Sequence, residues 1–511
     1  MRYPRATGTS TLDQGRQIAV VGGGVSAVCL LDALAESGGE PGGITVFETS
    51  CQLWRGRAFQ LDLETVRVNI PPEGMSLRFG DTTVFREWLS DRGGGQDYLD
   101  PFCGIRFVPR GLFGDYLAES AMAILAKLRQ QGWRIHVVRE SVLSAERLGD
   151  GLVLETEFGN QFQADHTVLC VGRGKPTDIY GLGDAPGFVP EPYPLSRTLA
   201  SIPTDAEVAV IGSGLTGIDV VLGLAQRSHQ GRIRLLSRSG VLPMVRQRPF
   251  SYELKHFTPE TFRAIAARGE RIGMDDVIAV MRAEFAAAGE DLDAIVGEIL
   301  RQEHEDPVAL LRRHLAEVDS SSLGLRILQR VVPVTGPDVW PVLTERDKNK
   351  LIREHYRAVM SVCCPMPPTT GNKLLGLIDS GQLKVGAGLR DVEAAPGGGF
   401  AITTDTGPLH ADYVINAVNV PADKIPAKAE PLISSLRDAG LAEQHPRGGV
   451  HVERATSRLT VNGVPDPRLY ALGDLASGSL FFTFGLPSLV DRAYDIAGAV
   501  TQESPALRNV A

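Results

Sequence analysis

Two glycine-rich segments with the same pattern of small residues stand out in this chain of 511 residues. The first, GGGVSA, runs from Gly22 to Ala27, and the second, GSGLTG, runs from Gly212 to Gly217. Small residues in this pattern allow a tight turn, a close approach of the backbone to a pyrophosphate, and close packing of a helix on a strand. The segments therefore predict two dinucleotide sites, with contacts at Gly22, Gly24, Ala27, Gly212, Gly214 and Gly217.

Each segment has the neighbours that such a loop requires. Apolar runs at 18–21 and 208–211 precede the two segments and are typical of buried strands, and helical periodicity follows each segment. The amino end of each helix would present free amides and a positive dipole end to phosphates. In a chain with 56 glycines an ordinary turn is the alternative reading of each segment, but the strand–turn–helix setting favours a dinucleotide site.

The residues that follow the second strand of each unit indicate which dinucleotide binds. Glu48 follows the apolar run 44–47, and a carboxylate there accepts hydrogen bonds from ribose hydroxyls and repels a 2′-phosphate. Ser237 and Arg238 follow the run 233–236, where a hydroxyl and a guanidinium suit a 2′-phosphate. We therefore expect FAD at the first site, where the carboxylate also suits NAD. At the second site we expect NADPH, with NADH as the alternative.

Composition narrows the class of protein. A formal net charge of −9 argues against a nucleic-acid partner, and no apolar run is long enough to cross a membrane. Residues 1–16 are polar and lack the apolar core of a signal peptide, so we expect a flexible lead-in and a cytoplasmic location. The six cysteines include no Cys-x-x-Cys pair and the ten histidines show no ligand spacing, so we expect neither a metal site nor a dithiol centre.

The order of the elements predicts an α/β fold with two Rossmann-like dinucleotide-binding domains, the second inserted in the first and carrying a helical insertion. Thr258 and Pro259 form a good helix start, and charged helical segments fill roughly 258–318 and 344–360. Short strands return near 383–385, 400–404 and 413–416, before a last helix at 488–501. The predicted divisions are a lead-in at 1–16, a first part of the FAD-binding domain at 17–198, an NADPH-binding domain at 199–379 with its insertion at about 250–340, and a second part of the FAD-binding domain at 380–511.

The chain resembles flavoproteins with two dinucleotide-binding domains, the broad set that includes flavin-containing monooxygenases. Within that set it is similar to the bacterial FAD-NAD(P)-binding family that contains L-aspartate N-monooxygenases. Besides the two glycine segments, the resemblance is carried by Arg57-Ala58-Phe59, Asn69-Ile70-Pro71, Met75-Ser76-Leu77, residues 107–117 and Ser237-Arg238-Ser239-Gly240. The chain departs from the pattern at Asn419, where the family has Gly, and over 361–368, where the family tends to have Arg and His.

The resemblance implies further site residues. Gly473-Asp474 matches a pair that binds the ribityl chain of a flavin, and the helix after Gly485 would stabilise the negative charge of reduced flavin with its dipole. The catalytic candidates beside the isoalloxazine ring are Asn69, Pro71 and Met75, for which an ordinary proline-bounded loop is the alternative. The resemblance also suggests Arg57 and Arg110 as cofactor contacts. The cationic anchors considered for an acidic substrate, by position only, are Arg57, Arg110, Arg246 and Arg248, and a structural or phosphate-contacting role is the favoured alternative for each.

The leading hypothesis is a monooxygenase in which NADPH reduces FAD and reduced FAD captures molecular oxygen as a C4a-hydroperoxide. The distal oxygen would pass to the amine of a small amino acid or a derivative, so the expected reaction is N-hydroxylation in a biosynthetic role. One alternative is an NADPH-dependent flavin oxidoreductase that does not insert oxygen. Another is a flavin-binding accessory subunit. The sequence leaves a homo-oligomer open.

Overall fold

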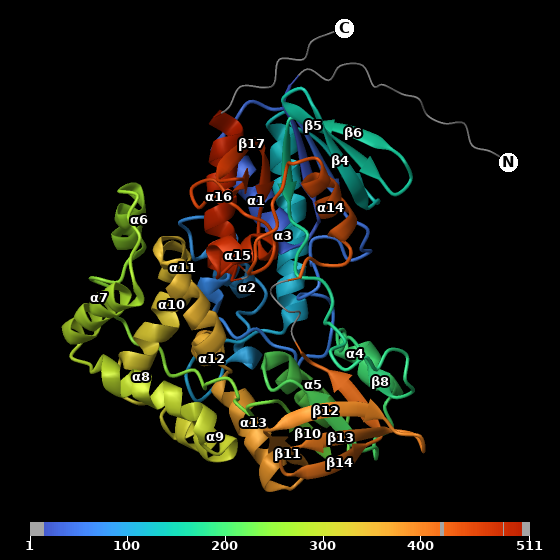
Figure 1. Ribbon diagram of the computed structural model, residues 1–511, viewed down its shortest axis with the longest axis vertical. Helices are drawn as coiled ribbons and strands as arrows, with labels where there is room; N and C mark the ends of the chain where they lie inside the picture. The colour runs from blue at the N-terminus through green and yellow to red at the C-terminus, as the bar shows by residue number, and fades with distance from the viewer. Residues whose placement is uncertain (1–14, 419–423, 484, 503–511) are drawn as a thin grey trace, which may run out of the picture.

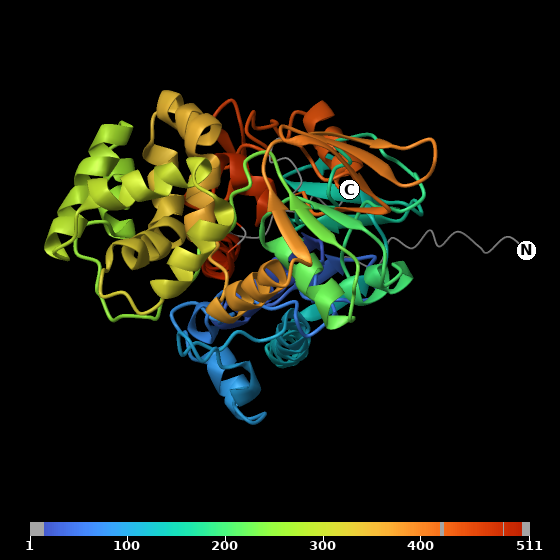
Figure 2. The same cartoon turned by 90° about the horizontal axis from the view of Figure 1, so that it is seen from below.

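The computed structural model describes residues 15–418, 424–483 and 485–502. Most of the predicted lead-in at 1–16 lies outside the described residues, and so does Asn419. The described chain builds two parallel sheets and a group of helices beside them, as Figures 1 and 2 show. This is the α/β fold with two Rossmann-like domains that the sequence predicts.

The first sheet has the strand order β16-β17-β7-β1-β2-β3. Its strands are parallel apart from the antiparallel pair β16–β17. The order of the strands reverses between β1 and β7, and open α/β sheets bind ligands at such a point. The strands are β1 (Gln17–Val21), β2 (Gly43–Phe47), β3 (Arg134–Val138), β7 (His166–Leu169), β16 (Arg458–Val461) and β17 (Val464–Ala471).

Alternating apolar residues of β1 pack into two hydrophobic cores, one on each face of the first sheet. Ile18 and Val20 pack with three helices, whereas Ala19 and Val21 pack with a three-stranded sheet and one helix. A strand buried on both faces reads as an unbroken apolar run, which explains the sequence of 18–21. The covering elements are α1 (Val25–Ser37), α3 (Arg110–Gln130) and α16 (Leu486–Gln502) on one face, and β4 (Val142–Leu148), β5 (Gly151–Thr156), β6 (Gln161–Ala164) and α14 (Glu430–Asp438) on the other.

The second sheet has the order β11-β10-β9-β15-β8 and is parallel throughout. One face packs on helices and the other on the antiparallel sheet β12-β13-β14. The strands are β8 (Phe188–Val189), β9 (Val208–Ile211), β10 (Ile233–Leu236), β11 (Leu383–Gly386), β12 (Leu389–Ala394), β13 (Phe400–Thr404), β14 (Gly407–Ala411) and β15 (Tyr413–Asn416), and the helices are α4 (Leu195–Thr198), α5 (Leu215–Gln226) and α13 (Pro368–Asp379).

The predicted domain boundaries at 198/199 and 379/380 are wrong. β11 pairs with β10 and β15 pairs with β9, so the chain does not return to the first domain at 380. β8 also joins the second sheet, through β15, although it lies before residue 198. The second domain therefore extends from about β8 to β15. Short apolar strands fit either sheet, and long-range pairing decides which sheet they join.

The helical insertion lies between β10 and β11 and stands to one side of the sheets (Figure 2). Its first helix begins as predicted, with the Thr258 side chain accepting from the Thr261 amide and Pro259 at the first helical position. The insertion extends beyond 340 and includes α10, whose three internal prolines conceal it in the sequence. Its helices are α6 (Pro259–Ala267), α7 (Met274–Ala287), α8 (Leu292–Arg301), α9 (Pro307–Ala316), α10 (Gly324–Val342), α11 (Glu345–Lys350) and α12 (Tyr356–Cys363).

The insertion contacts the first domain through α10. The Trp340 indole N–H donates to the Gly478 carbonyl at 3.1 Å, which ties α10 to α15 (Ser477–Leu480). Asp338 of α10 pairs with Arg454, which also pairs with Asp495 of α16 at 3.5 Å. The insertion is thereby held against the end of the first domain that carries the predicted flavin contacts. The remaining helix, α2 (Val84–Ser90), packs in the core of the first domain.

Candidate functional site

The first glycine segment lies where β1 and β7 separate. Gly22 has φ +106°, and a Cβ on it would lie 2.3 Å from the Cys170 carbonyl oxygen, so this position requires glycine. Gly24 caps α1, and a Cβ on it would lie 3.3 Å from Gly56 Cα. Ala27, in the first turn of α1, is fully buried. The segment thus joins strand to helix with its backbone at the surface, as a pyrophosphate contact requires.

Glu48 stands beside this segment at the carboxyl end of β2. Its Oε2 accepts from the Gly23 amide at 2.9 Å, and its Oε1 accepts from the Ser50 amide at 2.7 Å. These bonds fix the carboxylate next to the amino end of α1. The geometry places an acceptor where the ribose of a dinucleotide on this loop would lie.

Gly473 and Asp474 follow β17 and lie beside the first glycine segment. A Cβ on Gly473 would lie 3.0 Å from Ser26 Oγ in α1 and 3.5 Å from Leu489 Cδ2 in α16. Asp474 accepts from Arg173 Nε at 3.1 Å. The ends of β1, β7 and β17 and the first turns of α1 and α16 therefore converge on one spot. A sequence separation of hundreds of residues hides this convergence.

The second glycine segment repeats the geometry of the first. Gly212 has φ +111°, and a Cβ on it would lie 2.8 Å from the Ala417 carbonyl oxygen. A Cβ on Gly217 would lie 2.0 Å from the Gly212 carbonyl oxygen, so the helix could not pack so closely. A Cβ on Gly214 would meet no atom within 4 Å. Open space at Gly214 leaves room for a ligand to approach the backbone.

Ser237 and Arg238 lie at the carboxyl end of β10, beside the second segment. Ser237 Oγ accepts from the Gly240 amide at 2.9 Å and from Ser213 Oγ at 2.9 Å, so the hydroxyl shapes the turn. The Arg238 side chain is exposed. Its guanidinium is therefore accessible to a phosphate, while Ser237 is already bonded within the loop.

The predicted catalytic segment crosses from the first domain to the insertion. Asn69 Nδ2 donates to the Pro365 carbonyl at 3.4 Å, and the Asn69 carbonyl accepts from Arg246 Nε at 3.1 Å and Nη2 at 2.8 Å. Pro71 leads into a short 3₁₀ turn. Met75 is 3% exposed and packs in the core with residues of α1 and α3. Its place beside the isoalloxazine ring stays a prediction.

One stretch of the first domain matches a known family in sequence. Residues 19–174 match the model of the FAD-NAD(P)-binding family. The resemblance expected from the sequence is thus confirmed, and the match includes Gly22, Gly24, Ala27 and Glu48. No curated protein matches the chain in sequence.

Solved structures confirm the fold over nearly the whole chain. L-lysine 6-monooxygenase from Pseudomonas syringae is 15% identical, with a TM-score of 0.58 over 97% of this chain and 100% of that one. An ornithine N-hydroxylase from Kutzneria sp. 744 is 15% identical, with a TM-score of 0.53 over 95% and 98%. An ornithine hydroxylase from Pseudomonas aeruginosa is 16% identical, with a TM-score of 0.51 over 95% and 99%.

Two arginines predicted as cofactor contacts lie at the border of the first domain. Arg57 pairs with Glu191 Oε1 at 2.7 Å and donates to the Gly174 carbonyl at 2.9 Å. Arg110 donates to Asp219 at 2.7 Å, to the Tyr193 hydroxyl at 3.1 Å and to the Arg67 carbonyl at 3.2 Å. The Arg110 guanidinium thus joins the two domains, and cofactor contacts of Arg57 and Arg110 stay predictions.

Some residues near the predicted site residues were not assigned from the sequence. Arg173 bonds to Asp474, and Arg246 bonds to the Asn69 carbonyl. Burial raises the pKa of Tyr356, and the charges of Arg173 and Asp474 also act on its hydroxyl. Burial raises the pKa of Cys364 to about 11, against the opposing effect of Arg246 and Arg173. The local sequence around Tyr356 does not signal this proximity, because Arg173 and Asp474 are far away along the chain.

Burial lowers the pKa of the Arg246 guanidinium to about 10. Two of its donors hold the Asn69 carbonyl, which is the structural role that the sequence favours over an anchor for an acidic substrate. Arg248 pairs with Asp319 at 2.6 Å on the surface. Over the described ranges, no group of three or more His, Cys, Asp or Glu side chains is arranged to hold a metal ion. Within the same ranges, no helix has the length and apolar character needed to span a membrane.

Proposed function

We propose that this protein is an FAD- and NADPH-dependent monooxygenase that hydroxylates the amine nitrogen of a small amino acid or a derivative. The observation that carries the proposal is the presence of two dinucleotide loops, at Gly22 and Gly212, on two parallel sheets in one chain. The fold shared with a lysine monooxygenase and two ornithine hydroxylases supports the same reading. The Kutzneria enzyme is a complex with reduced FAD, NADP⁺ and L-ornithine.

The first loop fits FAD. Gly24, at the amino end of α1, has no side chain that would keep a pyrophosphate away from the backbone. The Glu48 carboxylate would accept from the ribose. Gly473 and Asp474, which follow β17, border the site on its other side. When bound there, FAD supplies the exchange of electrons with the nicotinamide and with oxygen. The protein's part is to hold the dinucleotide by backbone amides and to place the β17 end and α16 beside it.

The second loop fits NADPH. Gly214 has open space for a pyrophosphate, Gly217 allows α5 to pack closely on β9, and Arg238 offers a free-standing positive charge for a 2′-phosphate. The Kutzneria enzyme also contains NADP⁺. The second domain therefore presents a nicotinamide cofactor to the first.

The substrate amine must be uncharged at the nitrogen in order to attack oxygen. Arg173, Tyr356 and Cys364 are partly exposed, and the burial that raises the pKa of Tyr356 and Cys364 would also favour a neutral amine over an ammonium ion beside them. Arg246 holds the Asn69 backbone, which fixes the segment that borders the proposed substrate region.

The test is a turnover experiment on the purified full-length protein with FAD. NADPH is added in air with each member of a panel of amino acids and amines, and oxygen uptake, hydrogen peroxide and hydroxylamine are measured. The proposal expects at least one amine to give one hydroxylamine per NADPH with little peroxide. Recovery of all NADPH electrons as peroxide with every amine would establish the flavin oxidoreductase instead. A Gly214→Ala variant with normal FAD content is the control that blocks the second site, because its Cβ would meet no atom of the protein within 4 Å.

A further inference from the structure

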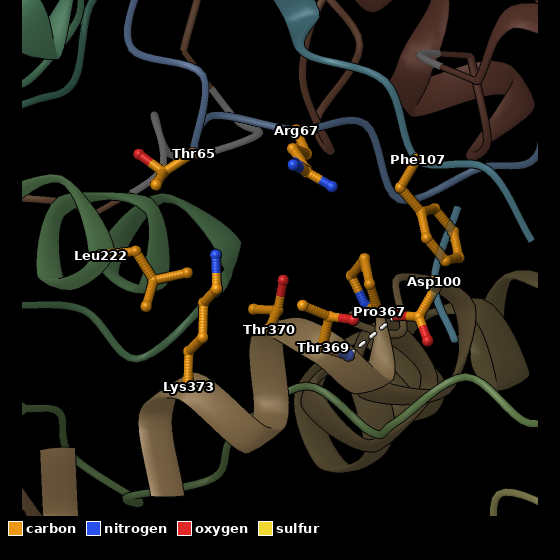
Figure 3. A pocket seen from close by; sticks show the side chains of 9 residues that line it. All are labelled: Thr65, Arg67, Asp100, Phe107, Leu222, Pro367, Thr369, Thr370 and Lys373. Atoms are coloured by element: carbon orange, nitrogen blue, oxygen red, sulfur yellow. Dashed lines mark hydrogen bonds between the residues drawn. The ribbon is translucent and has the colours of Figure 1, made fainter. Parts of the chain in front are cut away.

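A small hollow lies between the two domains (Figure 3). About 300 Å³ of space lies between its atoms, including open solvent, and the room inside its walls is about that of one water molecule, so it is a shallow hollow and not a closed cavity. Its walls come from the segment after Leu63, from the segment around Asp100, from α5 and from the first turns of α13. The lining residues are Thr65, Arg67, Asp100, Phe107, Leu222, Pro367, Thr369, Thr370 and Lys373.

Two positive charges from different domains face this hollow. The Arg67 side chain points into the hollow from the first domain, and the Lys373 side chain points into it from α13, with Thr370 beside Lys373 (Figure 3). Arg67 Nε donates weakly to the Glu64 carbonyl at 3.4 Å, and its guanidinium lies 5.5 Å from the centre of the Tyr98 ring. Lys373 is exposed, and neither cation forms an ion pair with any residue that the structure describes. Burial lowers the pKa of Lys373, and the charge of Arg67 lowers it further. The two cations therefore repel each other across the hollow.

The one carboxylate in the lining does not neutralise them. Asp100 is 2% exposed and accepts from the Phe102 amide at 2.9 Å, the Cys103 amide at 3.3 Å and the Thr369 amide at 2.8 Å. These bonds use its oxygens but leave its negative charge in place. One negative charge against the two positive charges of Arg67 and Lys373 leaves the lining net positive.

Hydroxyl groups and a helix terminus complete the lining. Thr369 Oγ1 is buried and has no hydrogen-bond partner in the described part of the chain, and Thr370 follows it in the first turn of α13. The Thr369 amide at the amino end of this helix already donates to Asp100, so the helix contributes its dipole and not this amide. Two cations and the unpartnered Thr369 hydroxyl form the chemistry that binds oxyanions.

We propose that this hollow is a binding site for a small oxyanion, a carboxylate or phosphate group, held between Arg67 and Lys373. The bound group bridges the first domain and α13. Arg67 is two residues from Asn69, and Pro367 of the lining is two residues from Pro365, to which Asn69 is bonded. Occupancy of the hollow therefore acts directly on the segment that borders the proposed substrate region.

The oxyanion has two sources, which the experiment separates. One source is free inorganic phosphate, and its binding does not depend on the proposed function. The other is the carboxylate of the amino-acid substrate, and this source rests on the proposed function. The shared chemistry is tested first, by calorimetry, because binding heat does not depend on turnover.

The experiment titrates sodium phosphate, and separately sodium acetate, into the full-length protein at constant ionic strength. The proteins compared are wild type, Arg67→Gln, Lys373→Gln, the double variant and the control Lys428→Gln, which changes an exposed lysine elsewhere. The proposal expects phosphate to bind the wild type and Lys428→Gln equally, and each single variant at least tenfold more weakly. Without phosphate, Lys373→Gln should be at least as stable to heat as the wild type, since it relieves repulsion.

Binding of neither anion to the wild type, or equal binding to wild type and double variant, would overturn the proposal. Phosphate that competes with the amino-acid substrate in the NADPH-oxidation assay would assign the site to the substrate carboxylate. Phosphate that binds without competing would assign it to a free anion. Failure of turnover with every amine would refute the proposed function and leave the calorimetric result standing.

Discussion

Arg110 and Asp219 form an ion pair at 2.7 Å that joins α3 of the first domain to α5 of the second. The Tyr193 hydroxyl donates to the same carboxylate, and Asp219 is 7% exposed. The pair lies in the interface between the domains and fixes their relative position. An interface of this kind sets how far apart the two dinucleotide loops lie.

Replacing Asp219 with alanine should destabilise the protein. The change leaves the Arg110 guanidinium buried without its counter-charge, and removal of one partner of a buried pair costs about 3 kcal/mol. The measurement is the urea midpoint of the purified variant. Asp293→Ala is the control, because Asp293 forms a comparable 2.8 Å pair with Arg282 at the surface and should leave the midpoint nearly unchanged. Equal midpoints for wild type and Asp219→Ala would contradict the structural role of the pair.

The second glycine loop gives a prediction with two variants. Gly214→Ala should fold normally, because its Cβ would meet no atom within 4 Å, yet raise the KM for NADPH at least tenfold by blocking the pyrophosphate. Gly217→Ala should instead lower the melting temperature, because its Cβ would lie 2.0 Å from the Gly212 carbonyl oxygen. The measurements are thermal melting, FAD content and the KM for NADPH. An unchanged KM in Gly214→Ala would remove this loop from nucleotide binding.

Replacing Arg238 tests whether the second site prefers NADPH or NADH. Arg238→Gln should raise the KM for NADPH about tenfold and leave that for NADH nearly unchanged, since a charge-assisted bond to the 2′-phosphate is lost. The measurement is the ratio of the two KM values. Arg232→Gln, which changes an exposed arginine just before β10, is the matched control. Similar effects on both cofactors would mean that Arg238 does not contact a 2′-phosphate.

The glycine positions could be predicted from the sequence because their causes are local. Gly22 and Gly212 each end a strand within a few residues of the helix that they introduce, and the positive φ that each requires is fixed by that turn. The same holds for Thr258, which caps α6 through a residue three positions away. The position of Glu48 beside Gly23 follows from the parallel pairing of two adjacent strands.

The remaining features depend on contacts that the local sequence does not contain. The strands at 383–386 and 413–416 are assigned to the second sheet only by their pairing with β10 and β9. Arg110 could face a phosphate or a carboxylate, and Asp219 becomes its partner only when the domains meet. α10 carries prolines at 333, 337 and 341, which local propensity excludes from a helix and which packing against α6 and α12 compensates.

His166 makes the stability of the first domain depend on pH. The ring is buried at the start of β7, and Arg468 Nη1 lies 2.8 Å from its Nε2. A guanidinium can only donate, so Nε2 accepts and the imidazole is neutral. Burial, then the charges of Arg468, Arg16 and Arg458, lower the pKa of His166 to about 3.

The sign of the effect follows from this depressed pKa. The unfolded chain takes up a proton as the pH falls through the ordinary histidine pKa of about 6.5, whereas the folded protein takes it up only near 3. The stabilising contribution is therefore complete above about 6.5 and is lost as the pH falls. Between pH 7 and pH 5 the loss is about 2 kcal/mol.

His166→Gln should remove this pH dependence and keep an acceptor for Arg468. We expect the urea midpoint of the wild type to fall more steeply than that of the variant between pH 7 and pH 5. His136→Gln, which changes an exposed histidine in β3 of the same sheet, should retain the steep fall. If His166→Gln loses as much stability as the wild type over this range, the imidazole is not held neutral by its buried arginine neighbours, and the pH dependence of this domain arises from its carboxylates.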